Sequence, residues 1–238
     1  MTSEAAGLAA SRLRSVKGMP AGMSGALPLQ LGPAELMLLA ERAVWWPERD
    51  TLFIADTHFG KEAAFRSRSI PIPDQTGDDL SRLSVLLQQT SAQRLTILGD
   101  LIHSRSGRSG RVFAQIADWR AQHESLEITL VRGNHDQSAG DPPTDWKIRC
   151  VDDPAVEQGI FLRHVPSADD LPAMAGHLHP VIQLTGPARD SVRLRCFLLQ
   201  QKTLVLPAFS SFVDGKKLRT SAQDRVFAIA EGVVFEVT

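Results

Sequence analysis

The stretch "DTLFIADTH", residues 50–58, joins an apolar run to two polar side chains. Its apolar centre predicts a buried strand, and Asp56 and His58 follow where that strand ends. The next residues, "GKEAAFRSR" (60–68), can begin a helix. An apolar strand that ends in polar residues and leads into a helix is typical of an α/β fold.

The same pattern recurs twice along the chain. "RLTILGD" (94–100) and "LEITLVRGNHD" (126–136) are apolar strands that end in polar clusters. Asp74 opens a helix over 74–90 with leucines at helical spacing, and residues 111–123 place Val112, Ile116 and Trp119 on one helical face. Strands that alternate with helices predict a parallel inner sheet, whose strand ends bring the polar clusters together.

The flanking segments predict more strands. "LPLQL", "LMLLA" and "RAVWW" precede residue 50, and short β-like pieces follow Pro154, which suggests a second, largely antiparallel sheet. We expect one α/β domain over residues 27–238, with two packed mixed β-sheets flanked by helices. Residues 1–26 are rich in Ala, Ser and Gly and predict a disordered tail, or an over-extended start if Met19 or Met23 is the true beginning.

Composition narrows the class of protein. With 43% apolar and 22% charged residues and a net charge of −1, the chain is ordinary for a globular protein and has no global basic field that would attract nucleic acid. No apolar run is long enough for a membrane span. The two cysteines are isolated, so we expect a cytoplasmic protein without disulfides.

Histidine is concentrated in the polar clusters. Six of the seven histidines lie in five short stretches, "ADTH", "GDLIH", "RGNHD", "RH" and "GHLHP", and only His123 falls outside them. Each stretch alone could be a helix cap or a turn. Taken together they predict one site, because the ends of neighbouring strands lie at the same edge of a sheet.

The types of side chain indicate a metal centre. Imidazoles and carboxylates without a thiolate suit Mn, Fe or Zn. Two carboxylates, one amide and four imidazoles exceed what one ion needs, so two ions that share a carboxylate fit better, at the separation of about 3.5–4 Å usual for such centres. Two divalent ions and two carboxylates leave a net positive charge, which favours an anionic substrate such as a phosphoester.

These motifs, in this order, resemble the calcineurin-like metallophosphoesterase family over residues 50–210 or so. The resemblance implies a four-layer sandwich and a phosphoesterase with two divalent ions. It implies that Asp56, His58 and His179 bind one metal, that Asn134, His164 and His177 bind the other, and that Asp100 bridges them. It also implies that His135 is the catalytic imidazole, and we expect Asp136 to orient its ring.

Two positions depart from the common family pattern. His164 is followed by "VPS" where relatives often have a Gly-His or His-His pair, and His103 stands where many relatives have Asp or Asn. We expect His103 to contact substrate, although a structural turn histidine is an equal alternative.

Softer details, such as "LGDLIHSR" and "LVLPAFSSF", resemble the bacterial ligase-associated DNA-damage-response phosphoesterases. That resemblance implies DNA as substrate and a DNA ligase, a helicase and an exonuclease-like protein as partners. Local charge agrees, since five arginines follow the first two motifs and can line the site: Arg66, Arg68, Arg105, Arg108 and Arg111. Without Tyr or interleaved aromatics, we expect recognition of the backbone rather than base stacking.

The sequence therefore predicts a phosphodiesterase acting on nucleic acid in DNA repair, as an endonuclease or in end processing. Alternatives are a small-molecule phosphodiesterase or phosphatase for cyclic nucleotides or dinucleotides, a protein phosphatase, or a non-catalytic metal-binding scaffold. The sequence does not fix the native metal among Mn, Fe and Zn, the mode of cleavage or the oligomeric state.

Overall fold

A computed structural model describes residues 25–66, 72–185 and 191–237. Most of the predicted tail lies outside these residues, but its last two residues belong to the fold. The carbonyl of Gly25 accepts a hydrogen bond from Val234 N at 2.8 Å, and Ala26 is buried in the core. Gly25 and Ala26 therefore contact the domain predicted for residues 27–238.

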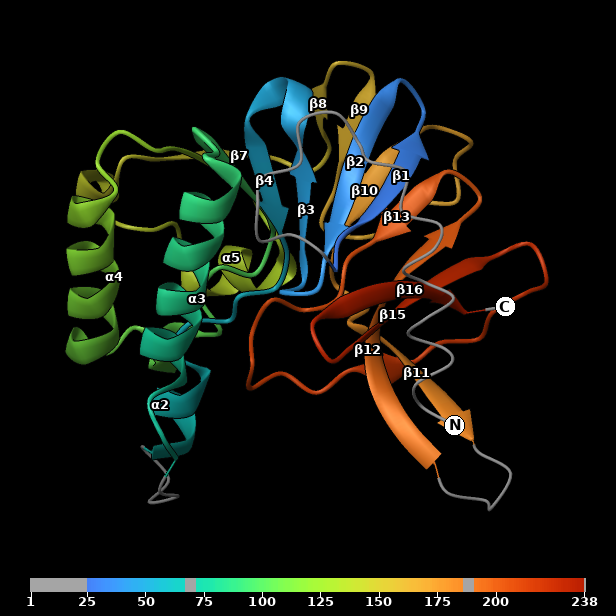
Figure 1. Ribbon diagram of the computed structural model, residues 1–238. Helices are drawn as coiled ribbons and strands as arrows, with labels where there is room; N and C mark the ends of the chain where they lie inside the picture. Colours follow the sequence, from blue (N-terminus) through green and yellow to red (C-terminus); the bar gives the residue numbers. More distant parts are fainter. Residues whose placement is uncertain (1–24, 67–71, 186–190, 238) are drawn as a thin grey trace.

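The first sheet has seven strands in chain order (Figure 1). They are β1 (Leu27–Leu31), β2 (Ala34–Leu39), β3 (Ala43–Trp46), β4 (Thr51–Ile54), β5 (Arg94–Leu98), β6 (Glu127–Val131) and β7 (Ile148–Val151). Strands β1 to β4 pair antiparallel, and β4 to β7 pair parallel. The predicted parallel inner sheet is thus present, and β4, β5 and β6 end at the same edge.

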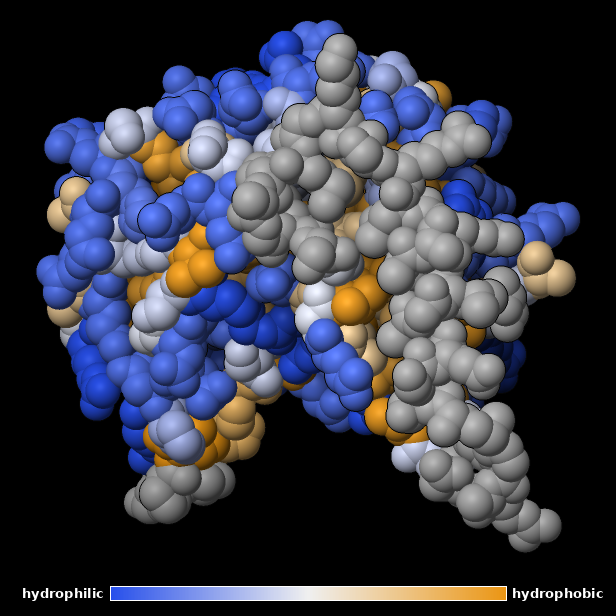
Figure 2. All heavy atoms as spheres, viewed as in Figure 1, coloured by the Kyte–Doolittle hydropathy of each residue, from blue (hydrophilic) through white to orange (hydrophobic). Residues whose placement is uncertain are grey.

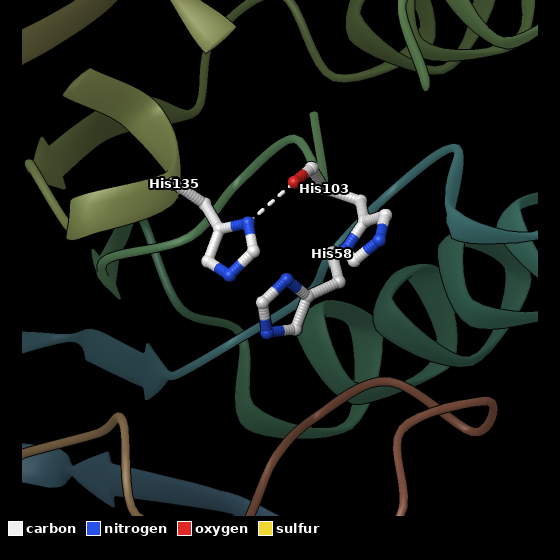
Figure 3. A group of neighbouring side chains, drawn as sticks. All are labelled: His58, His103 and His135. Carbon is white, nitrogen blue, oxygen red and sulfur yellow. Dashed lines mark hydrogen bonds between the residues drawn. The ribbon is translucent and has the colours of Figure 1, made fainter. Parts of the chain in front are cut away.

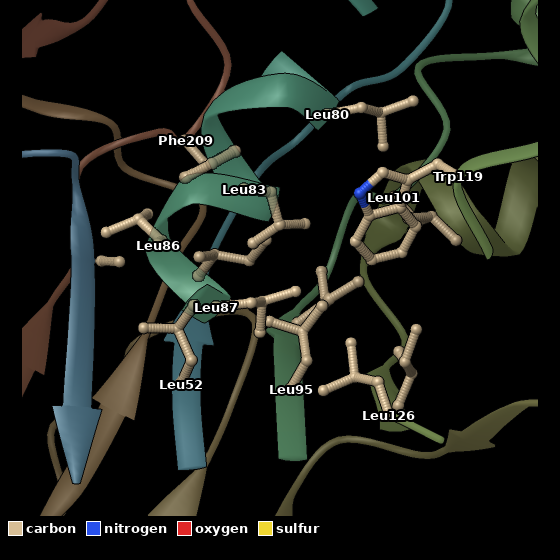
Figure 4. Close-up of a cluster of buried hydrophobic side chains, with 14 of the residues drawn as sticks. Leu52, Leu80, Leu83, Leu86, Leu87, Leu95, Leu101, Trp119, Leu126 and Phe209 are labelled. Atoms are coloured by element: carbon tan, nitrogen blue, oxygen red, sulfur yellow. The ribbon is translucent and has the colours of Figure 1, made fainter. Parts of the chain in front are cut away.

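Helices cover one face of this sheet. They are α2 (Lys61–Arg66), α3 (Gln75–Thr90), α4 (Gly110–Gln122) and α5 (Asn134–Ala139), and three short 3-10 turns occur at Pro47–Arg49, Arg105–Gly107 and Thr144–Trp146. Asp74 caps α3, because its side chain accepts from Gly77 N. Leucines of α3 and Trp119 of α4 pack with Leu52 and Leu95 of the sheet (Figure 4). No helix in the described ranges is long and apolar enough to cross a membrane.

The second sheet has nine strands and is mixed. They are β8 (Ala155–Glu157), β9 (Ile160–Leu162), β10 (Ala173–Ala175), β11 (Pro180–Thr185), β12 (Ser191–Gln200), β13 (Thr203–Val205), β14 (Lys216–Lys217), β15 (Arg225–Ala230) and β16 (Val233–Val237). Strand β10 runs parallel to both β9 and β13, and β11 runs parallel to β14. The sheet is less antiparallel than expected, because β9 and β10 are joined by a crossover rather than a hairpin.

The two sheets pack face to face through a second apolar core that includes Phe53, Phe197 and Phe227. Two packed mixed sheets with helices confirm the predicted fold class. All helices in the described residues flank the first sheet, and none of the described residues forms a helix on the outer face of the second (Figure 1). The functional consequence is a seam where the ends of β4, β5 and β6 meet loops of the second sheet.

Candidate metal centre

Loops from both sheets carry the predicted ligands to this seam. In chain order the ligands follow β4, β5, β6, β9 and β10: Asp56 and His58, Asp100, Asn134, His164, and then His177 and His179. Backbone hydrogen bonds join the loops directly, since His58 N donates to the Asp100 carbonyl at 2.8 Å. His177 N donates to Asp56 Oδ2 at 2.9 Å and links the second sheet to the first. The structure brings all seven side chains to one place.

The first group of potential ligands consists of Asp56, His58 and His179. One ligand atom from each lies within 4.8 Å of the other two. Asp56 Oδ1 and His179 Nε2 are 3.3 Å apart, and among the described residues neither atom has a hydrogen-bond partner, although both are buried. Buried polar atoms without partners need a compensating group, and a cation between them would fit.

The second group consists of Asp100, His164 and His177, again with ligand atoms within 4.8 Å of one another. Asn134 Oδ1 adds a fourth potential ligand atom, 2.9 Å from His164 Nε2. His164 Nδ1 lies 3.0 Å from the Leu98 carbonyl, which can only accept, so Nδ1 donates and Nε2 of the neutral ring has a free lone pair. Acceptor atoms that face one another in this way fit a metal ion.

Asp100 lies between the two groups and turns one oxygen toward each. Oδ1 is 3.5 Å from His164 Nε2, and Oδ2 is 3.7 Å from His58 Nε2. Burial raises the pKa of Asp100, because the charged carboxylate loses its hydration. A cation on either side would offset that cost, so the position suits a bridging ligand.

Five of the predicted ligands have a left-handed backbone. The φ angles of Asp56, His58, Asp100, His177 and His179 are 54°, 44°, 57°, 68° and 47°. Residues with a Cβ atom adopt this region rarely, at a cost of about 1 kcal/mol or more each. Strain at this density is characteristic of functional sites, where the surrounding structure fixes side-chain directions that relaxed loops would not maintain.

Two motif glycines make room for ligands from other motifs. A Cβ atom on Gly99 would lie 2.1 Å from the Nδ1 atom of His164, and one on Gly133 would lie 2.3 Å from Asp100 Oδ1. Gly99 also has a φ of 83°. The Gly-Asp and Gly-Asn pairs are therefore more than turns, because each glycine leaves space that another motif's ligand fills.

The predicted catalytic imidazole, His135, lies in the first turn of α5 beside Asp100. Its Nδ1 atom is hydrogen-bonded to the backbone carbonyl of His103 (Figure 3). Because a carbonyl only accepts, Nδ1 is the protonated nitrogen, and Nε2 lies 4.0 Å from Asp100 Oδ2, directed at the centre. The ring is thus fixed in one orientation, with one nitrogen available to a reacting group.

The expectation that Asp136 orients this ring is wrong. The Asp136 carboxylate instead accepts hydrogen bonds from the backbone N–H groups of Gly133, Asp100 and Leu101, at 2.8, 2.7 and 2.9 Å. Its side chain points back to the start of α5 and to the neighbouring Asp100 loop, where these three N–H groups favour a negatively charged partner. Asp136 therefore joins the second and third motifs, and the His103 carbonyl holds the His135 ring.

The side chain of His103 lies at the edge of the centre. Its ring stacks on His135 with centroids 5.2 Å apart, and ring nitrogens of His58, His103 and His135 lie within 4.8 Å of one another (Figure 3). Burial, together with the nearby His135 and Lys61, lowers the pKa of His103 to about 4. His103 is therefore neutral at physiological pH, and its contact with substrate stays a prediction.

The arginines expected to line the site contact the protein itself. Arg105 donates to the Ser138 carbonyl at 3.0 Å, and Arg108 donates to the carbonyls of residues 139, 140 and 141 at the end of α5. Arg66 lies 3.6 Å from Glu62, Arg111 lies 2.8 Å from Asp74, and Arg68 is outside the described residues. These contacts fix α5 and the surrounding loops, so a role in substrate binding stays a prediction.

Comparison with known proteins identifies the family. The sequence model of the calcineurin-like phosphoesterase family matches residues 50–202, which include every predicted ligand. The chain belongs to the calcineurin-like phosphoesterase family. It is a metal-dependent phosphoesterase, and its clustered histidines and aspartates are of the type that such enzymes use to hold divalent ions.

Two solved structures are similar to this phosphoesterase. The Pseudomonas putida nuclease MPE is 36% identical, with a TM-score of 0.77 over 89% of this chain and 100% of that chain. Yfce, a phosphoesterase from E. coli, is 15% identical, with a TM-score of 0.38 over 79% of this chain and 97% of that chain. No curated protein matches the sequence.

Sequence reasoning missed the segment that holds Asp56 in place. In this phosphoesterase, Ser210 N donates to the Asp56 carbonyl at 3.4 Å, and the buried Asp79 carboxylate accepts from Ser211 N at 3.0 Å. Arg42 donates to the Ser210 carbonyl at 2.9 Å. The apolar run "LVLPAFSSF" marked the segment, but only the fold shows that it supports the site.

Acid is expected to destabilise the metal-free phosphoesterase through His58. Burial, with smaller effects of His179, His135, His103 and Lys61, lowers the pKa of His58 to about 2. Below pH 6.5 the unfolded chain therefore binds a proton that the folded chain refuses until about pH 2, so stability is lost as the pH falls through this window. One such histidine accounts for about 2 kcal/mol between pH 7 and pH 5.

Urea unfolding with a chelator, at pH 7 and pH 5, measures this loss. The variant His58→Asn should lose about 2 kcal/mol less than the wild type over the same interval. An equal loss in both proteins would mean that His58 is accessible to protons in the folded state.

Proposed function

We propose that this phosphoesterase uses two divalent metal ions, with manganese preferred over iron or zinc, to hydrolyse phosphodiester bonds of DNA in repair, as an endonuclease or in end processing. The observation that carries this proposal is the position of Asp100, whose two oxygens face different groups of ligands. A carboxylate placed in this way suits two ions better than one. Nuclease activity in a relative that is 36% identical supports the substrate class.

The proposed ligand sets follow the two groups. Asp56, His58 and His179 hold one ion, and Asn134, His164 and His177 hold the other, with Asp100 shared. The neutral state of buried His58, whose pKa is lowered by burial, keeps its lone pair free for a metal. Oxygen and nitrogen donors without sulfur favour Mn, Fe or Zn.

The chain's own residues would share the work of hydrolysis as follows. When bound, the two ions supply positive charge that polarises the phosphate and the attacking water. His135 donates its Nδ1–H to the His103 carbonyl and directs Nε2 toward the centre. With both ring nitrogens protonated, it would give the Nε2 proton to the leaving oxygen, and the ring would be left neutral with the Nδ1 proton still in place. Asp136 keeps the Asp100 and Asn134 loops in register, and the stacked His103 ring limits rotation of His135.

The proposed biological setting rests on resemblance. Sequence details shared with ligase-associated repair phosphoesterases support DNA as the substrate and a DNA ligase, a helicase and an exonuclease-like protein as partners. A small-molecule diester, such as a cyclic nucleotide or a dinucleotide, would use the same chemistry. A matched set of substrates separates the two possibilities.

Steady-state hydrolysis with manganese should be compared on DNA, a cyclic mononucleotide, a dinucleotide and a phosphopeptide. We expect kcat/KM to be highest for DNA and to fall with salt, because a polymer releases counterions when it binds. Bis(p-nitrophenyl) phosphate serves as a control for an intact centre. Faster turnover of the cyclic mononucleotide or the phosphopeptide than of any DNA would overturn the nucleic-acid proposal.

A further inference from the structure

A lysine and a phenylalanine meet beside the metal centre. Lys61 Nζ lies over the ring of Phe212, 5.7 Å from its centroid. The rings of Phe65 and Phe212 are nearly perpendicular, with an interplanar angle of 85° and centroids 5.4 Å apart. All three side chains are partly exposed. The sequence did not indicate this contact, because Phe212 lies far along the chain from α2.

Both residues are attached to loops that carry ligands. Lys61 N donates to the His58 carbonyl at 3.1 Å, which places Lys61 at the start of α2. Phe212 N donates a hydrogen bond to Ser210 Oγ at 3.2 Å, and Ser210 N in turn donates to the Asp56 carbonyl. The pair therefore holds a fixed position relative to the centre.

The Lys61 ammonium differs from the arginines around it. Within the described ranges, no carboxylate lies within ion-pair distance of Lys61, whereas Arg66 and Arg111 each have an acidic partner. Asp214, the acid that acts most on Lys61, is paired with Arg193 at 3.2 Å. Burial lowers the pKa of Lys61, and its charge in turn lowers the pKa of His58 and His103, consistent with a cation close to the centre.

The loop that contains Phe212 lies against α2. In Figure 1 the loop that contains Phe212 runs between α2 and the β11–β12 hairpin. Figure 2 shows hydrophobic residues at the surface around α2, in the lower left of the view. The Lys61 ammonium and the Phe212 ring are both partly exposed, so a nucleotide bound next to the centre could contact them.

We propose that Lys61 and Phe212 form a subsite for the nucleotide next to the scissile phosphate. Lys61 forms an ion pair with the phosphate on the far side of that nucleotide from the scissile bond, and the Phe212 ring stacks on its base. Aromatic rings stack on any base and lysine binds phosphate as a point charge, so the subsite recognises nucleotides without reading sequence. This inference rests on the proposed nucleic-acid function, and it adds an unpaired base to the substrate requirement.

Thymidine dinucleotides test the subsite, because each contains one scissile diester. One base at a time is replaced by an abasic tetrahydrofuran, and a terminal phosphate is added at the 5′ or the 3′ end. For the wild type we expect loss of one of the two bases to lower kcat/KM about tenfold. We expect added phosphate at the same end to raise kcat/KM, because base and phosphate belong to one nucleotide.

The variants then assign these effects to residues. In Phe212→Leu the intact and abasic dinucleotides should be cleaved at nearly equal kcat/KM, while Phe212→Trp should keep the difference. In Lys61→Gln the added phosphate should no longer raise kcat/KM. Phe235→Leu, a partly buried ring in β16, and Lys147→Gln, an exposed lysine, are the matched controls and should behave as the wild type.

Two results would overturn the subsite. If Phe212→Leu lowered kcat/KM equally on intact and abasic dinucleotides, the ring would pack against the protein but not stack on a base. If the base effect and the phosphate effect came from opposite ends of the dinucleotide, Lys61 and Phe212 would not bind the same nucleotide. Thermal melting checks that the variants fold. If Phe212→Leu does not fold, Phe212→Trp and Lys61→Gln test the subsite in its place. Hydrolysis of bis(p-nitrophenyl) phosphate without cleavage of DNA or any dinucleotide would instead refute the proposed function.

Discussion

The variant Asp100→Asn is expected to retain less than one metal ion per chain and to lose about 10³-fold or more in the rate of diester hydrolysis. Asp100 is the one predicted ligand whose oxygens face both groups. Replacing one oxygen by an amide NH₂ group would remove a negative charge from between the two proposed ions and turn a hydrogen-bond donor toward one of them. Each factor of ten in rate corresponds to about 1.4 kcal/mol, and metal ions contribute several kcal/mol to such reactions.

Metal content after manganese loading, measured with hydrolysis of bis(p-nitrophenyl) phosphate, tests this expectation. His179→Ala is the informative comparison, because His179 belongs to one group only and its loss should empty or weaken a single site. Asp170→Asn, an exposed carboxylate paired with Lys202, is the matched control. If Asp100→Asn retained two ions, Asp100 would not be a bridging ligand.

The variant His135→Ala is expected to retain its metal and to lose about 10²–10⁴ in rate, the usual contribution of general acid catalysis. The loss should be larger for a DNA diester, whose leaving oxygen needs a proton, than for bis(p-nitrophenyl) phosphate, whose phenolate leaves without one. This difference separates proton delivery from a general disturbance of the centre.

His123→Ala is the control for His135→Ala, because His123 lies outside the clusters and bonds to Ser84 at 2.9 Å. It should change neither metal content nor the ratio of the two rates. Loss of metal from His135→Ala would identify His135 as a ligand. Equal losses on both substrates would indicate a role in binding the phosphate rather than in protonating the leaving group.

The strand and helix pattern of the first half was predictable because local rules coincide there. Asp74 caps α3 as expected, and the apolar faces of α3 and α4 are buried on the sheet. The convergence of Asp56, Asp100 and Asn134 followed from parallel strands, whose ends share an edge. The periodicity of apolar residues and the order of the motifs along the chain were sufficient for these predictions.

Contacts between motifs could not be predicted in the same way. The His103 carbonyl binds the His135 ring, and the Asp136 carboxylate binds three backbone amides, because α5 follows β6 at once and turns its first residues toward the Asp100 loop. The sequence had indicated only a turn there. Arg108 caps the other end of α5, a use of its guanidinium that charge counting cannot distinguish from a phosphate contact.

The contact between Ser210 and Asp56 has a further consequence for how the enzyme becomes active. Asp56 is translated early, yet its backbone is held by Ser210 and its carboxylate by the amide of His177, 121 residues away in sequence. Contacts between residues so far apart in sequence need a long loop to close before they can form. A nascent or truncated chain that ends before this segment would lack the complete centre, so phosphoester hydrolysis should begin only when nearly the whole chain is present.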